Sequence, residues 1–141
     1  MGVSTAERAD LASIAWISML EFFFAKARPR MLELWREFDL MPPQQMTLGL
    51  LLDAPRPMGD LAQQMHCDSS NITGIVDRLT ERGLVERLSA EGDRRVKLVA
   101  LTGPGRELAE ELARRRALPP DEIAALSDAD LRKLHRIFSA I

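Results

Sequence analysis

Cysteine is almost absent from this chain of 141 residues, in which Cys67 is the only one. A single cysteine excludes an intramolecular disulfide framework and is typical of a reducing compartment, so we expect a cytoplasmic protein. Histidine is scarce too, with only His66 and His135. Together with Cys67 they form one adjacent pair and a distant partner, a spacing that does not predict a metal site. We expect no metal and no cofactor.

Catalytic motifs are missing as well. The sequence has no phosphate-cradling glycine loop and no nucleophile elbow, and no acid and base stand at a spacing that would bring them together. We therefore expect a protein that is not an enzyme.

Long apolar runs are also lacking. The most apolar stretch, residues 11–24, is interrupted by Ser13, Ser18 and Glu21 and is too short to span a bilayer. Acidic residues precede it where a secretory signal would be basic. We expect no membrane segment and no signal peptide.

Positive charge is in short supply overall, because the formal net charge is −2. This balance excludes a nonspecific polycation but not a locally basic surface. Residues 78–97 contain six basic and four acidic residues, a local excess of two positive charges. The basic residues are Arg78, Arg82, Arg87, Arg94, Arg95 and Lys97.

The chain does contain a well-delimited helix over residues 68–83. Asp68 or Ser69 can cap its N-terminus, and Gly83 can take the left-handed conformation that ends it. One apolar stripe runs along it, because apolar residues recur at helical spacing. The stripe consists of Ile72, Ile75, Val76 and Leu79.

The opposite side of this helix is small and polar, where an ordinary surface helix would carry Glu and Lys. Such a face fits a DNA groove and can hydrogen-bond base edges and phosphates. Thr73 suits a thymine methyl or a phosphate. Arg78 suits the DNA backbone or a guanine, or instead pairs with Asp77 or Glu81. The predicted DNA contacts of the helix are Ser69, Ser70, Asn71, Thr73, Gly74 and Arg78.

Two strand-like segments follow, residues 84–89 and 96–101, joined by a glycine-containing turn. Their alternation is imperfect, so we expect a short twisted hairpin with both faces partly covered. Arg94 and Arg95 stand at its tip. Upstream, residues 58–65 predict a supporting helix. The whole reads as a helix-turn-helix followed by a wing.

The segment from about Pro57 to Leu108 resembles the DNA-binding core of the MarR family of bacterial transcriptional regulators. The resemblance rests on VDRLTERGLVER at residues 76–87 and GDRRVKLVALT at residues 92–102. It implies an obligate dimer that binds palindromic operators and releases them on meeting a small ligand or an oxidant.

For the wing, the resemblance implies that Arg94 reaches the minor groove, while Arg95 and Lys97 serve phosphate contact or wing structure. The alternative is a solvated charged turn. Relatives that sense peroxides carry a cysteine in the first helix, which has none here. We therefore expect Cys67 to be a small buried residue of the turn rather than a redox switch.

Apolar helices flank this core. Residues 5–38, with a kink at Pro29, are apolar nearly all round, and a last helix begins at a capping box over residues 127–130. A short helix is expected at 44–52, then a rigid loop at 53–57. A helix apolar on several faces must be buried on several sides. We expect a two-fold dimer with interlocking N- and C-terminal helices, which sets two recognition helices about one turn of DNA apart.

Aromatic residues gather in the first helical region, where the simplest role is core packing. The resemblance implies an effector cleft between the first two helices and the DNA-binding lobe, suited to a small aromatic effector. The candidate lining residues are Trp16, Phe23, Trp35 and Phe38.

These observations predict a mainly α protein with a small β-hairpin wing, a dimeric winged helix-turn-helix. Residues 1–141 form a single MarR-type domain, with dimerisation helices at 5–40 and 104–141 and a DNA-binding lobe at 44–103. The expected function is a sequence-specific, double-stranded-DNA-binding transcriptional regulator, a ligand-responsive repressor that binds a palindromic operator as a homodimer. The alternative is a winged-helix module for protein–protein contact without operator binding.

Overall fold

The computed structural model describes residues 4–141, apart from the side chain of Arg94. The chain forms two compact units. The central unit is Leu34–Ala117, and the terminal unit combines the residues up to Glu33 with Leu118–Ile141. The protein is mainly helical with one small antiparallel sheet, which confirms the predicted fold class.

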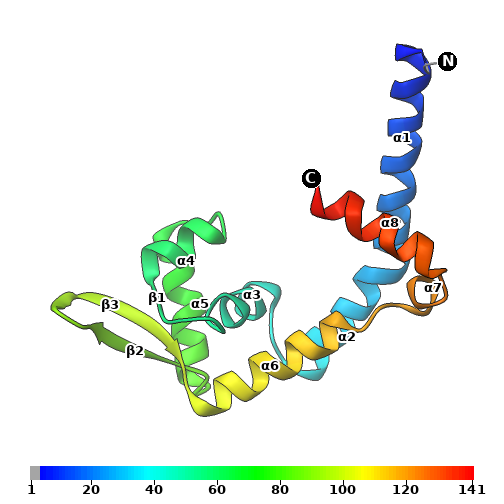
Figure 1. Ribbon diagram of the computed structural model, residues 1–141. Coiled ribbons are helices and arrows are strands. Elements are labelled where there is room, and N and C mark those ends of the chain that lie inside the picture. The colour runs from blue at the N-terminus through cyan, green and yellow to red at the C-terminus, as the bar shows by residue number, and fades with distance from the viewer. Residues whose placement is uncertain (1–3) are drawn as a thin grey trace. The chain divides into compact units, whose positions relative to one another are not determined.

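The terminal unit is built from helices. Helix α1 (Thr5–Phe22) is followed by a π-helical turn, η1 (Phe23–Ala27), and by α2 (Arg28–Glu37), whose residues from Leu34 belong to the central unit. Near the C-terminus lie α7 (Asp121–Ala124) and α8 (Asp128–Ser139). Figure 1 traces these helices along the chain.

The kink predicted at Pro29 takes the form of the π-helical turn just before it. Proline has no backbone N–H and its ring crowds the carbonyl four residues earlier, which here is that of Ala25. Residues 23–27 respond with the wider hydrogen-bonding pattern of a π-helix.

Polar contacts join the two segments of the terminal unit. The Arg30 guanidinium donates hydrogen bonds to the carbonyls of Leu118 and Pro119, both at 3.2 Å. Lys26 and Glu122 form an ion pair at 2.5 Å. None of the residues that the structure describes in this unit is fully buried.

The central unit contains four helices and the sheet. The helices are α3 (Pro42–Leu50), α4 (Met58–Gln64), α5 (Ser69–Glu81) and α6 (Gly103–Ala117). Strands β1 (Arg56–Pro57), β2 (Val85–Ala90) and β3 (Asp93–Leu101) lie in the order β1-β3-β2, all antiparallel.

Two sequence-based expectations about this unit were wrong. The helix expected at Gln44 begins at Pro42, because prolines are tolerated in a first helical turn, where the N–H groups have no helical partner. The loop expected at residues 53–57 ends in β1, which pairs Arg56 with Val99 and Pro57 with Leu98. This strand forms only because β3 offers an edge to it.

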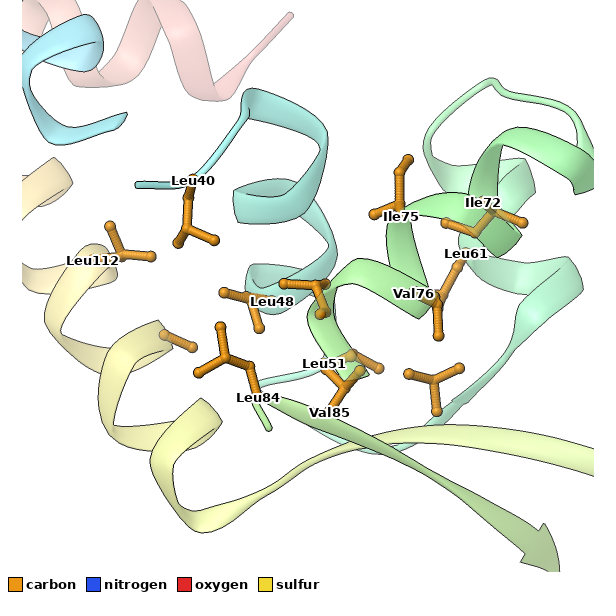
Figure 2. Packing of buried hydrophobic residues seen from close by; sticks show 13 residues of the cluster. Leu40, Leu48, Leu51, Leu61, Ile72, Ile75, Val76, Leu84, Val85 and Leu112 are labelled. Atoms are coloured by element: carbon orange, nitrogen blue, oxygen red, sulfur yellow. The ribbon is translucent and has the colours of Figure 1, made fainter. Parts of the chain in front are cut away.

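The core of the central unit gathers around α5 (Figure 2). Ile72, Ile75, Val76 and Leu79 are all buried, as the apolar stripe predicts. They pack with Leu48 of α3, Leu51 just after it, Leu61 of α4 and Val99 of β3, among others. Burying each such side chain contributes roughly 1.5–3 kcal/mol before conformational entropy is subtracted.

The hairpin differs from its predicted covering. Val85 at the start of β2 and Val99 in β3 are buried, whereas β2 from Glu86 to Ser89 is exposed. The expectation of two partly covered faces therefore holds only at the base of the hairpin. Figure 1 shows why: the turn of the hairpin reaches away from the helices of this unit, so no element packs on its outer half.

Candidate nucleic-acid interface

A helix, a tight turn and a second helix form the centre of the candidate site. Helix α4 ends at Gln64, Met65 follows as its C-terminal cap, and His66 takes a left-handed conformation (φ 49°) that reverses the chain. The backbone N–H of Cys67 then donates to the carbonyl of Ala62 at 3.0 Å, which closes the turn. Cys67 is half-buried within it.

Asp68, rather than Ser69, caps helix α5. Its carboxylate accepts hydrogen bonds from the Asn71 backbone N–H and the Ser70 hydroxyl, each at 2.8 Å. The Asn71 bond first and the Ser70 bond second lower the pKa of the Asp68 carboxyl. A carboxylate is also the group that the positive end of a helix favours. The predicted left-handed residue at the other end is confirmed, with Gly83 at φ 69°.

The polar face of α5 points to solvent along its length. All six side chains or glycines predicted to contact DNA are exposed there: Ser69, Ser70, Asn71, Thr73, Gly74 and Arg78. The Thr73 hydroxyl donates to the carbonyl of Ser69 at 2.7 Å, so its proton is already used within the helix. With only one long cation, Arg78, on this face, α5 is slim enough to lie in a major groove.

Arg78 pairs with neither of the two acidic residues considered as its partners, Asp77 and Glu81. Asp77 pairs with Arg87 of β2, with Arg87 Nη2 at 2.6 Å from Asp77 Oδ1. Among the described residues, Arg78 makes no ion pair. Sequence periodicity missed Arg87 because the pair joins a helix to a strand, a relation that no helical spacing encodes.

The wing places basic residues around an irregularity of β3. Ser89 pairs with Lys97 and Ala90 with Asp93, so residues 94–96 are extra on the β3 side. Such bulges redirect side chains. Arg95 and Lys97 are exposed, and Lys97 Nζ lies 3.1 Å from the Ser89 hydroxyl. The side chain of Arg94, the predicted minor-groove contact, lies outside the described residues.

Not every arginine of this basic region is available. The Arg82 guanidinium donates to the backbone carbonyls of Phe38, at 3.1 Å, and Asp39. These bonds tie the end of α5 to the segment between α2 and α3. Arg82 is therefore a structural residue, and Arg87 is held by Asp77.

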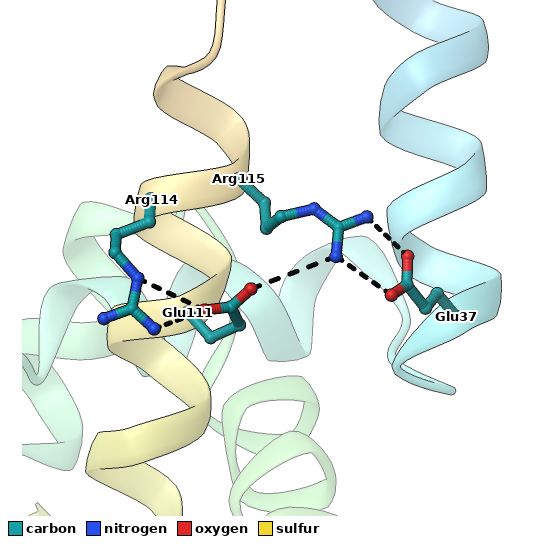
Figure 3. A network of polar contacts seen from close by, with 4 residues as sticks. All are labelled: Glu37, Glu111, Arg114 and Arg115. Atoms are coloured by element: carbon teal, nitrogen blue, oxygen red, sulfur yellow. Dashed lines mark hydrogen bonds and ion pairs between the residues drawn. The ribbon is translucent and has the colours of Figure 1, made fainter.

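Two arginines at the end of α6 are structural in the same way (Figure 3). Arg115 forms a two-pronged pair with Glu37 of α2, at 2.7 and 3.0 Å, and its guanidinium lies 6.0 Å from the centre of the Phe38 ring. Arg114 pairs with Glu111. These contacts engage two arginines of the run within the protein.

The four candidate effector residues divide between the two units. Trp16 and Phe23 belong to the terminal unit and are exposed, while Trp35 and Phe38 belong to the central unit and are half-buried. The central unit has a cavity of about 330 Å³ between α3 and α6. Its lining includes Gln45, Met46, Gly49, Ala109, Leu112 and Arg116, and none of the four candidates.

Two further properties concern the whole described chain. Between residues 4 and 141 no three His, Cys, Asp or Glu side chains gather closely enough to hold a metal ion. Over the same residues, no helix combines the length and apolar character needed to cross a bilayer.

Comparison with known proteins places this geometry in a family. The MarR family model matches residues 46–97. The chain is 30% identical over 114 residues to the HTH-type transcriptional repressor MdtR of Bacillus subtilis (strain 168), covering 79% of this chain and 74% of MdtR. It is 39% identical over 69 residues to the HTH-type transcriptional regulator YfiV of the same organism, covering 48% of this chain and 43% of YfiV. The chain thus spans less than half the length of YfiV.

A solved structure extends the similarity to the whole fold. YusO from Bacillus subtilis matches with a TM-score of 0.71 and 26% sequence identity, covering 98% of this chain and 96% of that one. The helix-turn-helix, the wing and the flanking helices therefore all fall within the matched part of this solved structure. Given the similarity to MdtR over most of both chains, the protein belongs to the MarR family of winged helix-turn-helix transcriptional regulators.

Proposed function

We propose that this protein is a sequence-specific regulator that binds double-stranded DNA through α5 and the wing. The observation that carries the proposal is the two-sided character of α5. Its apolar stripe is buried in the core, while the N-terminal half of its exposed face presents only short polar groups, followed by Arg78. A helix fixed so firmly, with a face so narrow, suits insertion into a major groove.

Each side chain has a distinct role in this proposal. Asn71 and Ser70 near the N-terminus of α5 contact base edges or phosphates, and the Thr73 methyl contacts a thymine. Arg95 and Lys97 of the wing bind phosphates, and Arg94 contacts the minor groove. Phosphate contacts set affinity and salt dependence, and base contacts set sequence preference.

The working unit in this proposal is a homodimer formed by the terminal helices. Exposed large apolar side chains crowd the terminal unit, where a monomer would leave them in water. A two-fold dimer would bury them and present two copies of α5 to successive major grooves of a palindrome. The residues concerned are Leu11, Ile14, Trp16, Ile17, Phe24, Ile137 and Phe138.

The dimer is further proposed to act as a ligand-responsive repressor. The relative MdtR is described as a transcriptional repressor. A small apolar effector would shift the population towards conformations in which the two recognition helices no longer match the groove spacing.

Selection of bound sequences from a random DNA pool, followed by fluorescence anisotropy at several salt concentrations, tests the proposal. A single enriched palindrome and a steep fall of affinity with salt are expected. The second candidate function, a winged-helix module for protein contacts, predicts weak binding with little salt dependence and no enriched sequence. That result would overturn DNA regulation as the function.

A further inference from the structure

One ion pair joins the recognition helix to the wing. Arg87 of β2 and Asp77 of α5 meet at 2.6 Å, with 36% and 50% of their side chains exposed. Among the described side chains, this is the one hydrogen bond between α5 and the two hairpin strands. It therefore stands where the two DNA-contacting elements of the proposed function meet.

The pair lies where the apolar packing of the wing stops. Arg87 is opposite Val99 in the antiparallel register, so both side chains lie on the same face of the sheet. Val85, two residues earlier on that face, is buried against the core, whereas β2 is exposed from Glu86 to Ser89. Core packing fixes the base of the hairpin, and the next inward-facing side chain is Arg87.

Asp77 also raises an electrostatic question. A carboxylate on the exposed face of a DNA-binding helix repels phosphates and weakens binding. Arg87 neutralises that charge at contact distance. An acidic residue is useful in such a place if it holds in position another structural element that DNA binding requires.

We propose that Asp77 and Arg87 are positioning residues that hold the wing at a fixed place relative to α5. Through this pair, the polar face of α5 and the basic residues Arg95 and Lys97 engage one duplex in adjacent grooves. The inference rests on the proposed DNA-binding function and adds a specific role for two residues. Neither residue touches DNA itself in this scheme.

The competing role for Arg87 is a direct phosphate contact, and the two roles differ in the sign of one effect. If Arg87 binds phosphate, D77N frees Arg87, removes a repulsive charge and tightens operator binding. If the pair positions the wing, D77N weakens binding even though it makes the surface more positive. E81Q is the matched control, because it removes the charge of an exposed carboxylate of α5 that has no ion pair among the described residues.

The experiment measures operator affinity by anisotropy for wild type, D77N, R87Q, D77N/R87Q and the charge swap D77R/R87D. The double variant keeps the formal net charge at −2, and so does the swap. We expect the double variant to bind about three- to fivefold more weakly, the size of effect an exposed ion pair can supply. The swap should recover at least half of the lost affinity, while E81Q binds as tightly as wild type or more so.

A distance measurement tests the positioning without any DNA. Spin labels at T80C and E91C, in a C67S background and diluted with excess unlabelled protein, report the separation of α5 and the wing turn. We expect a narrow distribution in the wild-type background, a broad one with D77N, and a narrow one again with the charge swap.

The outcomes distinguish the DNA-binding function from the positioning role of the ion pair. Absence of any preferred DNA sequence for the wild type would overturn the proposed function, and the spin-label result would still report on wing positioning. Tighter binding by D77N, a reduced salt slope for R87Q, or an unchanged distance distribution would overturn the positioning role and leave DNA binding intact.

Discussion

The carbonyl oxygen of Leu84 occupies the space in which a side chain at position 105 would begin. A Cβ built on Gly105 would lie 1.8 Å from that oxygen and 2.7 Å from the carbonyl carbon. The same oxygen accepts the backbone N–H of Thr102 at 3.1 Å, so it is fixed in place. The absence of a side chain at Gly105 therefore allows α6 to start directly against the base of the wing.

Gly105→Ala should lower the free energy of unfolding by about 1–3 kcal/mol, because either α6 or the Leu84 backbone must shift. Urea denaturation at one fixed protein concentration measures the change. Gly49→Ala is the matched control, since a Cβ at that helical position meets no atom within 4 Å. The control should be neutral or stabilising by up to about 1 kcal/mol. Equal effects of the two substitutions would contradict the close contact.

The cap of α5 should make stability depend on acid pH. The pKa of Asp68 is lowered in the folded protein, mainly by the Asn71 backbone N–H, from an ordinary value of 3.8. A lowered folded-state pKa contributes stability above the unfolded value that is lost as pH falls through the folded value. Asp68→Asn keeps a capping oxygen but cannot titrate. The melting temperature of the wild type should therefore exceed that of the Asn variant near pH 6. The difference between the two melting temperatures should disappear as the pH falls below 3.8. A difference that stays constant with pH would exclude the cap as its source.

A substitution at Gly74 should change stability and DNA binding in opposite directions. It lies inside α5 on the exposed face, and a Cβ there meets no atom within 4 Å of the chain. Gly74→Ala should raise the free energy of unfolding by about 0.5–1 kcal/mol through helix propensity. The added methyl group should nevertheless weaken operator binding, because it stands on the face proposed to enter the groove. A variant that is stabilised and binds unchanged would place Gly74 outside the interface.

The terminal helices should determine the oligomeric state. Trp16 and Phe24 are 56% and 58% exposed in the single chain. Trp16→Glu with Phe24→Glu should convert the dimer to a monomer in sedimentation at micromolar concentration, because charged groups would be buried at the interface. Met41→Glu is the control, since Met41 is similarly exposed at 62% but belongs to the central unit. A wild-type chain that sediments as a monomer would remove the homodimer from the proposal.

Local sequence signals predicted helix α5 well. A cap, an apolar stripe and a terminal glycine all lie within sixteen residues, and each acts through neighbours along the chain. A contact of the same local kind stands at the start of α6, where the Thr102 hydroxyl accepts the Gly105 backbone N–H at 3.1 Å. The exposed polar face was predictable for the same reason.

Relations between distant residues were not predictable. Strand β1 contains a proline and only two residues, and it is a strand because β3 runs beside it. The Asp77–Arg87 pair depends on the angle between a helix and a hairpin, which no spacing rule gives. The exposure of the outer hairpin likewise depends on where the other elements end. These features belong to tertiary structure alone.

The pairing of Arg56 with Val99 has a consequence for biosynthesis. Val99 is fully buried in the core that also contains the apolar side chains of α4 and α5. That core is incomplete until Val99 has been synthesised. During translation, about forty residues must emerge after β1 before Val99 of β3 can complete the core. A ribosome-bound chain should thus stay incompetent for groove recognition until the last strand of the wing has left the exit tunnel, and then acquire that competence in one cooperative step.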